Sequence, residues 1–357
     1  MTPATNVALP TLAELDAAAA LIYEAMPATP QYRWPLLDAR CGAEVWVKHE
    51  NHTPVGAFKV RGGLVYFDML QRELPGLPGV VTATRGNHGQ SVGFAARRHG
   101  MRATVLVPHG NSTEKNAAMR ALGVELIEEG HDFQAASDAA AVIAAERGWH
   151  RIPSFHGLLV RGVGTWALEL LRAAGELDAL YVPIGLGSGI CGAIAARDAL
   201  GLRTEIIGVV SAGAPAYRLS LEAGRPVSHD VTTLVADGMA CRTPVPEALA
   251  IIAAGVARVV SVTDDEVKAA MCAMFADTHN VAEGGGAAGL AALLQERLAV
   301  KGRRVGIVLS GGNVDSGVFG RVLGASDSPT ALAPLSELSI PVSASSPRVA
   351  THPAGPV

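Results

Sequence analysis

Two motif-bearing segments lie near the start of this chain, Lys48-His49-Glu50-Asn51 and Gly56-Ala57-Phe58-Lys59-Val60-Arg61-Gly62. The second contains the candidate functional lysine, Lys59. Lys59 has apolar neighbours on both sides. Burial in such surroundings lowers the pKa of a lysine and makes its neutral amine a nucleophile for an aldehyde. By itself the segment is also compatible with a surface lysine at the start of a helix.

Three glycine-containing loops follow short apolar runs farther along the chain. Thr84-Arg85-Gly86-Asn87-His88-Gly89 stands before a predicted helix, whose first N–H groups bind anions such as a carboxylate. Gly185-Leu186-Gly187-Ser188-Gly189 has three glycines in five residues, which let the backbone approach a phosphate. Ser310-Gly311-Gly312-Asn313 is the third loop. Each loop taken alone is also compatible with an ordinary turn.

The apolar pattern predicts alternating strands and helices, typical of parallel strands that are buried on both faces. Such sheets bind ligands at the carboxyl ends of their strands, where the three loops lie. The predicted strands are Glu44–His49, Val80–Ala83, Ala103–Val107, Val124–Ile127, Ala179–Ile184, Glu205–Val210, Arg258–Val262 and Arg304–Leu309. The predicted helices are Thr11–Met26, His88–His99, Thr113–Leu122, Phe133–Arg147, Gly164–Ala174, Ile190–Leu200, Asp264–Asp277 and Gly286–Leu298, and a loop is predicted around Pro27, Pro30 and Pro35.

The composition favours a globular α/β protein. The chain has 357 residues, 49% of them apolar, and 40 glycines that suit strand-to-helix turns. A net charge of −4 favours neither nucleic acid nor an anionic membrane as a partner. The four scattered cysteines and the lack of a basic leader indicate a reduced, cytoplasmic protein without a membrane span.

As an ordered set, these motifs resemble the fold type II pyridoxal-phosphate (PLP) enzymes, specifically the threonine/serine dehydratase and serine racemase branch, over roughly residues 10–325. The resemblance implies an α/β fold like that of the tryptophan synthase β subunit, with two open, twisted, mostly parallel sheets flanked by helices. It is carried by Lys48-x-Glu50-Asn51, Gly56-x-Phe58-Lys59-x-Arg61-Gly62, Gly86-Asn87-His88-Gly89-Gln90, Ser310-Gly311-Gly312-Asn313 and the pairs Glu114-Lys115 and Met119-Arg120.

The resemblance also implies a role for each site residue. Lys59 would form the Schiff base with PLP and act as the catalytic base. Asn87 would hydrogen-bond the phenolic oxygen of the ring, Ser310 would face the pyridine nitrogen, and the glycine loop would wrap the phosphate. The implied cofactor-binding set is Phe58, Lys59, Asn87, Gly185, Leu186, Gly187, Ser188, Gly189 and Ser310, and the implied substrate-binding set is Thr84, Arg85, Gly86, Asn87, His88 and His156.

The implied reaction is α,β-elimination of water from a β-hydroxy-α-amino acid, with release of a 2-oxo acid and ammonia. A hydroxyl at Ser310 cannot keep the pyridine nitrogen protonated as a carboxylate would, which suits elimination better than a long-lived carbanion. The substrate is L-threonine, L-serine or a bulkier relative such as phenylserine or 3-hydroxyaspartate. The alternatives are an amino-acid racemase, a PLP-binding protein without catalysis and, from the glycine loop alone, a nucleotide-dependent oxidoreductase.

Several positions depart from the family pattern. Arg85 stands where relatives carry Ser or Ala, and arginine is a poor proton shuttle, which argues against racemisation as the main activity. Arg85 is interpreted either as a ligand for a substrate carboxylate or aromatic ring, or as an arginine that points to solvent or pairs locally. His156 is either a contact of the β-substituent or a structural residue. Ser211 replaces the glutamate of metal-binding relatives, so no metal site is expected, and Asp237 is interpreted as a turn residue.

The resemblance divides the chain into two domains. Residues 1–55 and 160–325 are predicted to form a large PLP-binding domain, and residues 56–159 a small α/β domain. Residues 326–357 are rich in Ser, Pro and Ala and are predicted to be a disordered tail. The family default is a homodimer.

Overall fold

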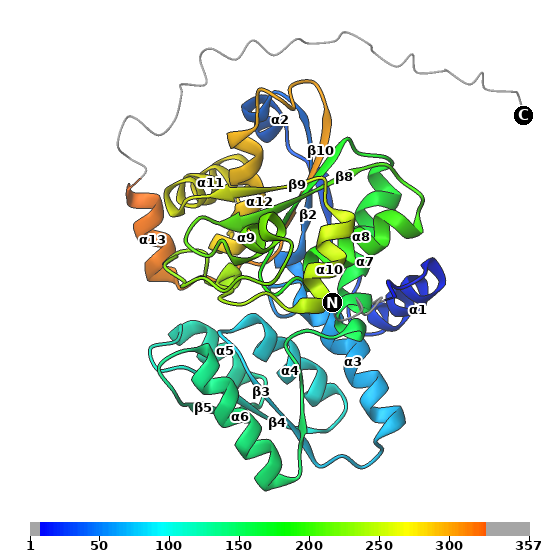
Figure 1. The fold of residues 1–357 in the computed structure, drawn as a ribbon, viewed down its shortest axis with the longest axis vertical. Helices are drawn as coiled ribbons and strands as arrows, with labels where there is room; N and C mark the ends of the chain where they lie inside the picture. Colours follow the sequence, from blue (N-terminus) through cyan, green and yellow to red (C-terminus); the bar gives the residue numbers. More distant parts are fainter. Residues whose placement is uncertain (1–7, 326–357) are drawn as a thin grey trace, which may run out of the picture.

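The computed structural model describes residues 8–325 and contains two open sheets (Figure 1). The first has six strands, in which β1 is antiparallel to β2 and the other neighbours are parallel. Its strands in spatial order are β1 (Gln31–Arg33), β2 (Glu44–His49), β10 (Arg304–Leu309), β7 (Ala179–Pro183), β8 (Glu205–Ser211) and β9 (Arg258–Val262). The second sheet is parallel throughout, in the order β5 (Glu125–Glu128), β4 (Arg102–Val107), β3 (Gly79–Ala83) and β6 (His150–Arg151). The predicted two-sheet α/β architecture is confirmed.

Helices cover both faces of each sheet. On one face of the six-stranded sheet lie α2 (Pro35–Cys41), α11 (Asp264–Thr278), α12 (Gly284–Gln295) and, packed on α11, α13 (Ser316–Ala325). On its other face lie α1 (Leu12–Tyr23), α7 (Gly157–Ala174), α8 (Ser188–Ala199), α9 (Ala216–Ala223) and α10 (Pro246–Gly255). The four-stranded sheet packs against α3 (Lys59–Glu73), α4 (Asn87–Arg98) and α5 (Thr113–Ala121) on one face and α6 (Phe133–Arg147) on the other.

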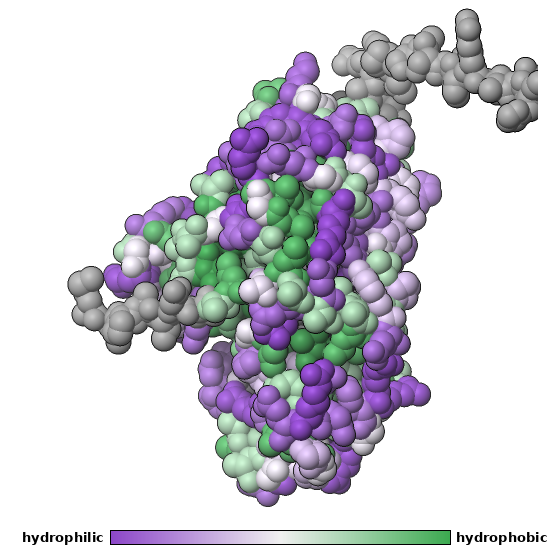
Figure 2. Space-filling view, turned by 90° about the vertical axis from the view of Figure 1, so that its right-hand side faces the viewer, coloured by the Kyte–Doolittle hydropathy of each residue, from purple (hydrophilic) through white to green (hydrophobic). Residues whose placement is uncertain are grey.

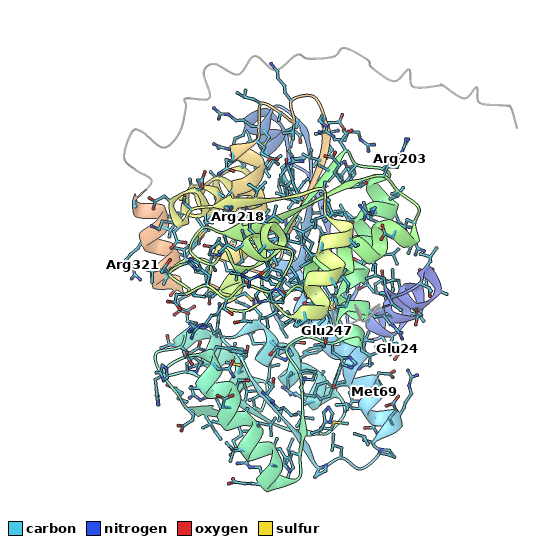
Figure 3. All side chains as sticks on the ribbon, viewed as in Figure 1. Glu24, Met69, Arg203, Arg218, Glu247 and Arg321 are labelled. Atoms are coloured by element: carbon cyan, nitrogen blue, oxygen red, sulfur yellow. The ribbon has the colours of Figure 1, made fainter. Side chains whose placement is uncertain are left out.

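The surface combines polar and apolar regions. Figure 2 shows hydrophobic residues gathered over the middle of one face, with hydrophilic residues above and below them. Side chains fill the space between the two sheet layers (Figure 3). No helix within residues 8–325 is long and apolar enough to cross a membrane.

The N-terminal prediction needs three corrections. The first helix ends at Tyr23 instead of Met26, although the capping box of Thr11 and Glu14 is present as predicted. The predicted proline loop contains β1, a three-residue edge strand that is too short to show a periodic pattern. Pro35 begins α2 instead of breaking the chain, because proline has no N–H to satisfy and is well suited to the first position of a helix.

Helix α7 begins at Gly157, seven residues before its predicted start, because three glycines among its first eight residues obscure the helical pattern. Tertiary packing explains one of them. A Cβ at Gly162 would lie 2.4 Å from the carbonyl oxygen of Arg61, so glycine allows α7 to approach α3 closely.

The division of the chain into two domains stays a prediction. The four-stranded sheet comprises residues 79–151, within the predicted small domain, and α3 packs against both α7 and α4. The predicted tail, residues 326–357, lies outside the described residues.

Candidate active site

Residues from motifs that are far apart in the sequence line one pocket. It lies at the carboxyl ends of β3, β7 and β10, next to the start of α3. Its wall includes Phe58, Lys59, Thr84, Arg85, Gly86, Asn87, His88, Lys115, Phe133, Ser154, Gly185, Leu186, Gly187, Ser188, Gly189, Asp237, Gly238, Met239, Glu283, Gly285 and Ser310. The structure therefore places every predicted cofactor-binding residue on one surface, together with all but one of the predicted substrate-binding residues.

Lys59 is the first residue of α3, and backbone contacts hold it beside the loop that follows β10. The N–H of Phe58 donates to the carbonyl of Ser310 at 3.0 Å, and the hydroxyl of Ser91 donates to the carbonyl of Lys59 at 2.7 Å. Within residues 8–325, Nζ of Lys59 forms no hydrogen bond or ion pair and lies 4.8 Å from the centre of the Phe58 ring. The amine is thus available to a ligand in the pocket.

The surroundings of Lys59 favour its neutral form. Burial lowers the pKa of Lys59 to about 8, although the charge of Glu283 opposes the shift. His88 lies in the same wall, and burial, reinforced by the charge of Lys59, lowers the pKa of His88 to about 3. A neutral histidine beside a lysine with a lowered pKa leaves the amine able to act as a nucleophile and as a base near neutral pH.

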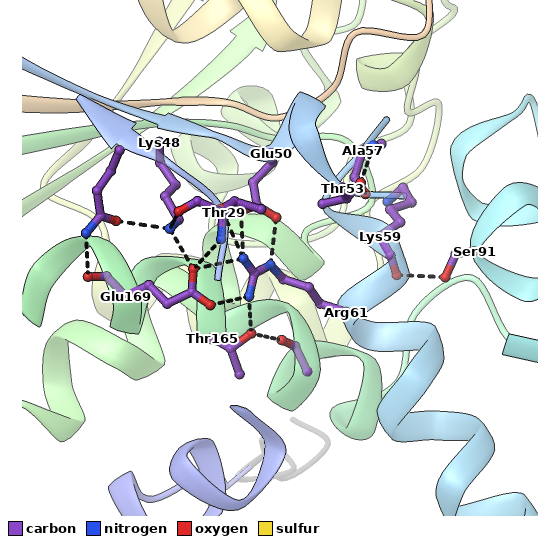
Figure 4. Close-up of polar contacts among 12 residues, drawn as sticks. Thr29, Lys48, Glu50, Thr53, Ala57, Lys59, Arg61, Ser91, Thr165 and Glu169 are labelled. Atoms are coloured by element: carbon purple, nitrogen blue, oxygen red, sulfur yellow. Dashed lines mark hydrogen bonds and ion pairs between the residues drawn. The ribbon is translucent and has the colours of Figure 1, made fainter. Parts of the chain in front are cut away.

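A buried ionic network anchors the first turn of α3 behind Lys59 (Figure 4). Arg61 is fully buried and donates to Glu50 at 2.7 and 2.9 Å and to Glu169 at 2.6 and 2.9 Å. Nζ of Lys48 donates to Glu169 at 2.6 Å, so that two cations face two carboxylates. Lys48, Glu50 and Arg61 belong to the motifs that carry the family resemblance, and the structure shows that they form one network with Glu169.

Both polar atoms of the side-chain amide of Asn87 form hydrogen bonds. Its Nδ2 donates to Oε1 of Glu283 at 2.6 Å, and its Oδ1 accepts from Nδ2 of Asn313 at 2.9 Å. A carboxamide nitrogen carries two hydrogens, so Asn87 keeps a second N–H for a ligand in the pocket. This is the group that the resemblance assigns to the phenolic oxygen.

The loop between β7 and α8 forms a cradle for an anion. Gly187 precedes α8 with a φ of +104°, and a Cβ there would lie 2.6 Å from Cβ of Ala248. The first intrahelical bond runs from the N–H of Cys191 to the carbonyl of Gly187 at 3.0 Å. The N–H groups of Ser188, Gly189 and Ile190 therefore lack a carbonyl partner within the helix, which is the arrangement that binds phosphate.

Ser310 lies in the same wall, 8% exposed, and its hydroxyl donates to the carbonyl of Gly285 at 3.3 Å.

The turn before α4 contains the candidates for substrate binding. Thr84 is buried, and its hydroxyl accepts from the N–H of Gly86 at 2.9 Å. Arg85 is exposed at the pocket and has no hydrogen bond or ion pair within the described range.

His156 lies outside the pocket wall that the other candidate residues share, and its contact with the substrate stays a prediction. It is absent from the pocket wall and caps α7, where its Nδ1 accepts from the N–H of Leu158 at 3.1 Å. Its ring packs edge-on against Tyr66. These contacts favour the structural alternative for this histidine.

Three charged residues of the wall were not predicted as site residues. Lys115 and Glu283, both buried, and the partly exposed Asp237 form a cluster there, in which the ammonium lies 2.7 Å from Asp237 and 3.2 Å from Glu283. Asp237, interpreted from sequence as a turn residue, does form a short 3₁₀ helix, η2 (Asp237–Met239), but it also carries one of these charges. The only sequence signals were the Glu114-Lys115 pair and the unusual Glu283-Gly284-Gly285-Gly286 run.

The residues present fit PLP. The free amine of Lys59 suits the aldehyde of PLP, and the second N–H of Asn87 suits its phenolic oxygen. The 185–189 loop suits the phosphate, and the hydroxyl of Ser310 suits the pyridine nitrogen. When bound, PLP supplies an aldehyde that condenses with amines and a ring that accepts electrons.

We expect the rate at which Lys59 of the cofactor-free protein reacts with PLP to depend on pH. Only the neutral amine attacks an aldehyde, and its fraction reaches one half at a pH equal to its pKa. The rate should therefore rise with pH and level off above a midpoint of about 8. Stopped-flow absorbance of the imine measures this, and a midpoint near the ordinary lysine value of about 10.4 would contradict the burial of the amine.

Comparisons with known proteins agree with this geometry. The model of the family described as pyridoxal-phosphate dependent enzymes matches residues 22–311. An L-threonine ammonia-lyase of Geobacter sulfurreducens is 37% identical over 77% of this chain and 69% of its own length. An L-threo-3-hydroxyaspartate ammonia-lyase of Saccharomyces cerevisiae is 31% identical over 90% of this chain and 99% of its own. The chain spans only 58% of the biosynthetic L-threonine dehydratases of Escherichia coli and Haemophilus influenzae.

A solved structure shows the same architecture. The structure of maize serine racemase superposes with a TM-score of 0.82 and 27% sequence identity, over 89% of this chain and 98% of that one. The extent of the family match and the identity to the ammonia-lyases lead to one assignment: this chain belongs to the family of pyridoxal-phosphate dependent enzymes.

Proposed function

We propose that this protein is a PLP-dependent ammonia-lyase that converts a β-hydroxy-α-amino acid to a 2-oxo acid and ammonia. The observation that carries the proposal is Lys59, whose amine has no partner within residues 8–325 and a pKa lowered to about 8 in a pocket that fits PLP. The ammonia-lyase names of two relatives that match most of this chain support the same reaction.

The residues of the chain divide the work of the elimination. The N–H groups of Asn87, His88 and Gly89 in the first turn of α4 bind the substrate carboxylate, since those of Thr84 and Gly86 already donate within the protein. Lys59 in its neutral form removes the α-proton as general base. Ser310 would have to turn its hydroxyl from the carbonyl of Gly285 to donate to the pyridine nitrogen, and a neutral partner there would favour departure of the β-hydroxyl over a persistent carbanion.

Racemisation is the second candidate, and the resemblance to maize serine racemase motivates it. A racemase needs a proton donor on the face opposite Lys59. Arg85 occupies the position before Gly86, and a guanidinium is a poor donor and acceptor of protons. The geometry therefore supports elimination as the main activity.

The homodimer and the cytoplasmic location also belong to the proposal. The hydrophobic residues over the middle of one face (Figure 2) support contact with a second subunit. The four cysteines are free thiols, three of them buried, which supports a reducing compartment.

A substrate panel tests the function. We expect PLP-loaded protein to release 2-oxo acid and ammonia in equal amounts from at least one of L-threonine, L-serine, threo- and erythro-phenylserine and 3-hydroxyaspartate. Chiral analysis of the remaining amino acid tests racemisation in the same samples. Inversion of configuration without release of ammonia would replace the lyase by a racemase.

Arg85→Gln serves as the matched variant in that panel. A preference for 3-hydroxyaspartate that depends on Arg85 should weaken about 10- to 100-fold in kcat/KM, because a charge-assisted hydrogen bond contributes about 1.5–3 kcal/mol. Activity toward threonine should change little. An equal loss for all substrates would show that Arg85 does not select the side chain.

A further inference from the structure

Lys115, Asp237 and Glu283 form a charge cluster in which three separate elements meet. Lys115 lies in the first turn of α5, which packs beside the four-stranded sheet, whereas Asp237 lies in η2 and Glu283 directly precedes α12. The side chains of Lys115 and Glu283 are 6% and 4% exposed, and that of Asp237 is 35% exposed. The lysine therefore spans from one sheet layer to charged groups of the other, inside the wall of the active-site pocket.

The aliphatic stem of Lys115 supports the turn that binds the substrate carboxylate in the proposed function. A Cβ at Gly86 would lie only 2.4 Å from Cδ of Lys115. Gly86 has a φ of +153°, in the region that favours glycine, and immediately precedes α4. The stem therefore packs directly beneath the backbone of this turn.

The ammonium of Lys115 acts on Asn87 through Glu283. One oxygen of Glu283 lies 3.2 Å from the ammonium, and the other accepts the hydrogen bond from Nδ2 of Asn87 at 2.6 Å. A carboxylate only accepts hydrogen bonds, whereas a protonated carboxyl group also donates. The orientation of Asn87, and with it the direction of its second N–H, depends on the ionised form of Glu283.

The ionised form of Glu283 is costly at this place and needs a cation. Burial raises the pKa of Glu283, and the charge of Asp237 raises it further, while Lys115 lowers it. Lys59 also faces Glu283. Of these two lysines, Lys115 is the one within 4 Å of the carboxylate.

We propose that Lys115 is a positioning residue for the reaction, which holds Glu283 as the anion that orients Asn87 and supports Gly86 beneath the substrate. This inference rests on the proposed function. It requires no direct contact of Lys115 with the reacting atoms.

The pH profile of kcat/KM distinguishes this role from simple packing. Lys115→Met keeps the length of the side chain and removes its charge, so the acidic limb that reports Glu283 should move up by about 1 to 3 pH units. Asp237→Asn removes a like charge near Glu283, so the same limb should move down. Lys115→Arg keeps the charge and should leave the limb near its wild-type position.

A second readout uses the cofactor-free protein and needs no substrate. A carboxyl whose pKa is raised by folding contributes stability that is present at low pH and is lost as the pH rises through the folded pKa. Lys115→Met should therefore lose more stability than the wild type between acidic and neutral pH in urea unfolding. The extra loss should disappear in Lys115→Met combined with Glu283→Gln.

The outcomes separate the two proposals. A shift of the limb in the same direction in Lys115→Met and Asp237→Asn, or a uniform loss of activity at all pH values, would overturn the positioning role. If no substrate of the panel reacts, the proposed function fails, and the urea titration alone tests the link between Lys115 and Glu283. If Lys115→Met does not fold, the direction of the shift in Asp237→Asn decides.

Discussion

Lys59→Ala is expected to lower kcat by about 10³-fold or more and to remove the visible absorbance of the imine between the protein and PLP. Two causes act together. The substitution removes the amine that binds the aldehyde and the neutral base that accepts the α-proton, and a positioned base alone contributes about 10²- to 10⁴-fold. No other lysine replaces it, because within the described residues the second lysine of the pocket, Lys115, is held by Asp237 and Glu283.

The measurement combines absorbance spectra with a coupled assay for the 2-oxo acid. Lys301→Ala, at an exposed position, serves as the control and should retain both signals. Circular dichroism should show the same fold in both variants, since the side chain of Lys59 forms no hydrogen bond or ion pair within residues 8–325. Turnover retained by Lys59→Ala would refute the assignment of the catalytic lysine.

Arg61→Met is expected to have the second large effect, a loss of about 3–5 kcal/mol in the free energy of unfolding. Arg61 and Glu50 are fully buried and Glu169 is nearly so, and removal of the guanidinium leaves two carboxylates with the single ammonium of Lys48. Breaking a buried ion pair costs this much because an uncompensated charge remains in the interior. The misplaced first turn of α3 should also weaken PLP binding.

The loss should depend on pH in a defined direction. Burial raises the pKa of Glu169, whereas the charge of Arg61 lowers it, so in the variant this pKa should rise and part of the lost stability should return as the pH falls and Glu169 becomes protonated. Arg172→Met on the surface of α7 is the matched control, because its pair with Asp16 is exposed and should change stability by less than about 1 kcal/mol. Urea unfolding over a pH series measures the free energy of unfolding of both variants. Equal losses would show that the buried network stabilises the fold no more than an exposed ion pair does.

Much of the fold could be predicted from sequence because parallel strands and their helices leave local patterns. Four elements have the predicted bounds, namely the strands Glu44–His49, Arg258–Val262 and Arg304–Leu309 and the helix Phe133–Arg147, and most other predicted elements differ by one to three residues. The prediction failed where local signals were weak. β1 has only three residues, and Gly162 of α7 is explained by packing against α3, which no local pattern reveals.

The active site divides in the same way. Lys59, Asn87, the 185–189 loop and Ser310 were found because each belongs to a short run of residues with a recognisable chemistry. Lys115 and Asp237 are separated by 122 positions, and Asn87 and Glu283 by 196, so no motif contains either pair. His156 carried a polar side chain at a plausible position, and its helix cap became visible only in three dimensions.

The family, the α/β architecture and the order of the cofactor-binding motifs follow from the sequence, because they depend on residue types at short spacing. The charges that line the pocket and the partners that compensate Arg61 and Lys115 follow from the packing of the folded chain. The physical reason is that burial and Coulomb interactions depend on distances between elements far apart in the chain, and these distances exist only after the two sheets have packed.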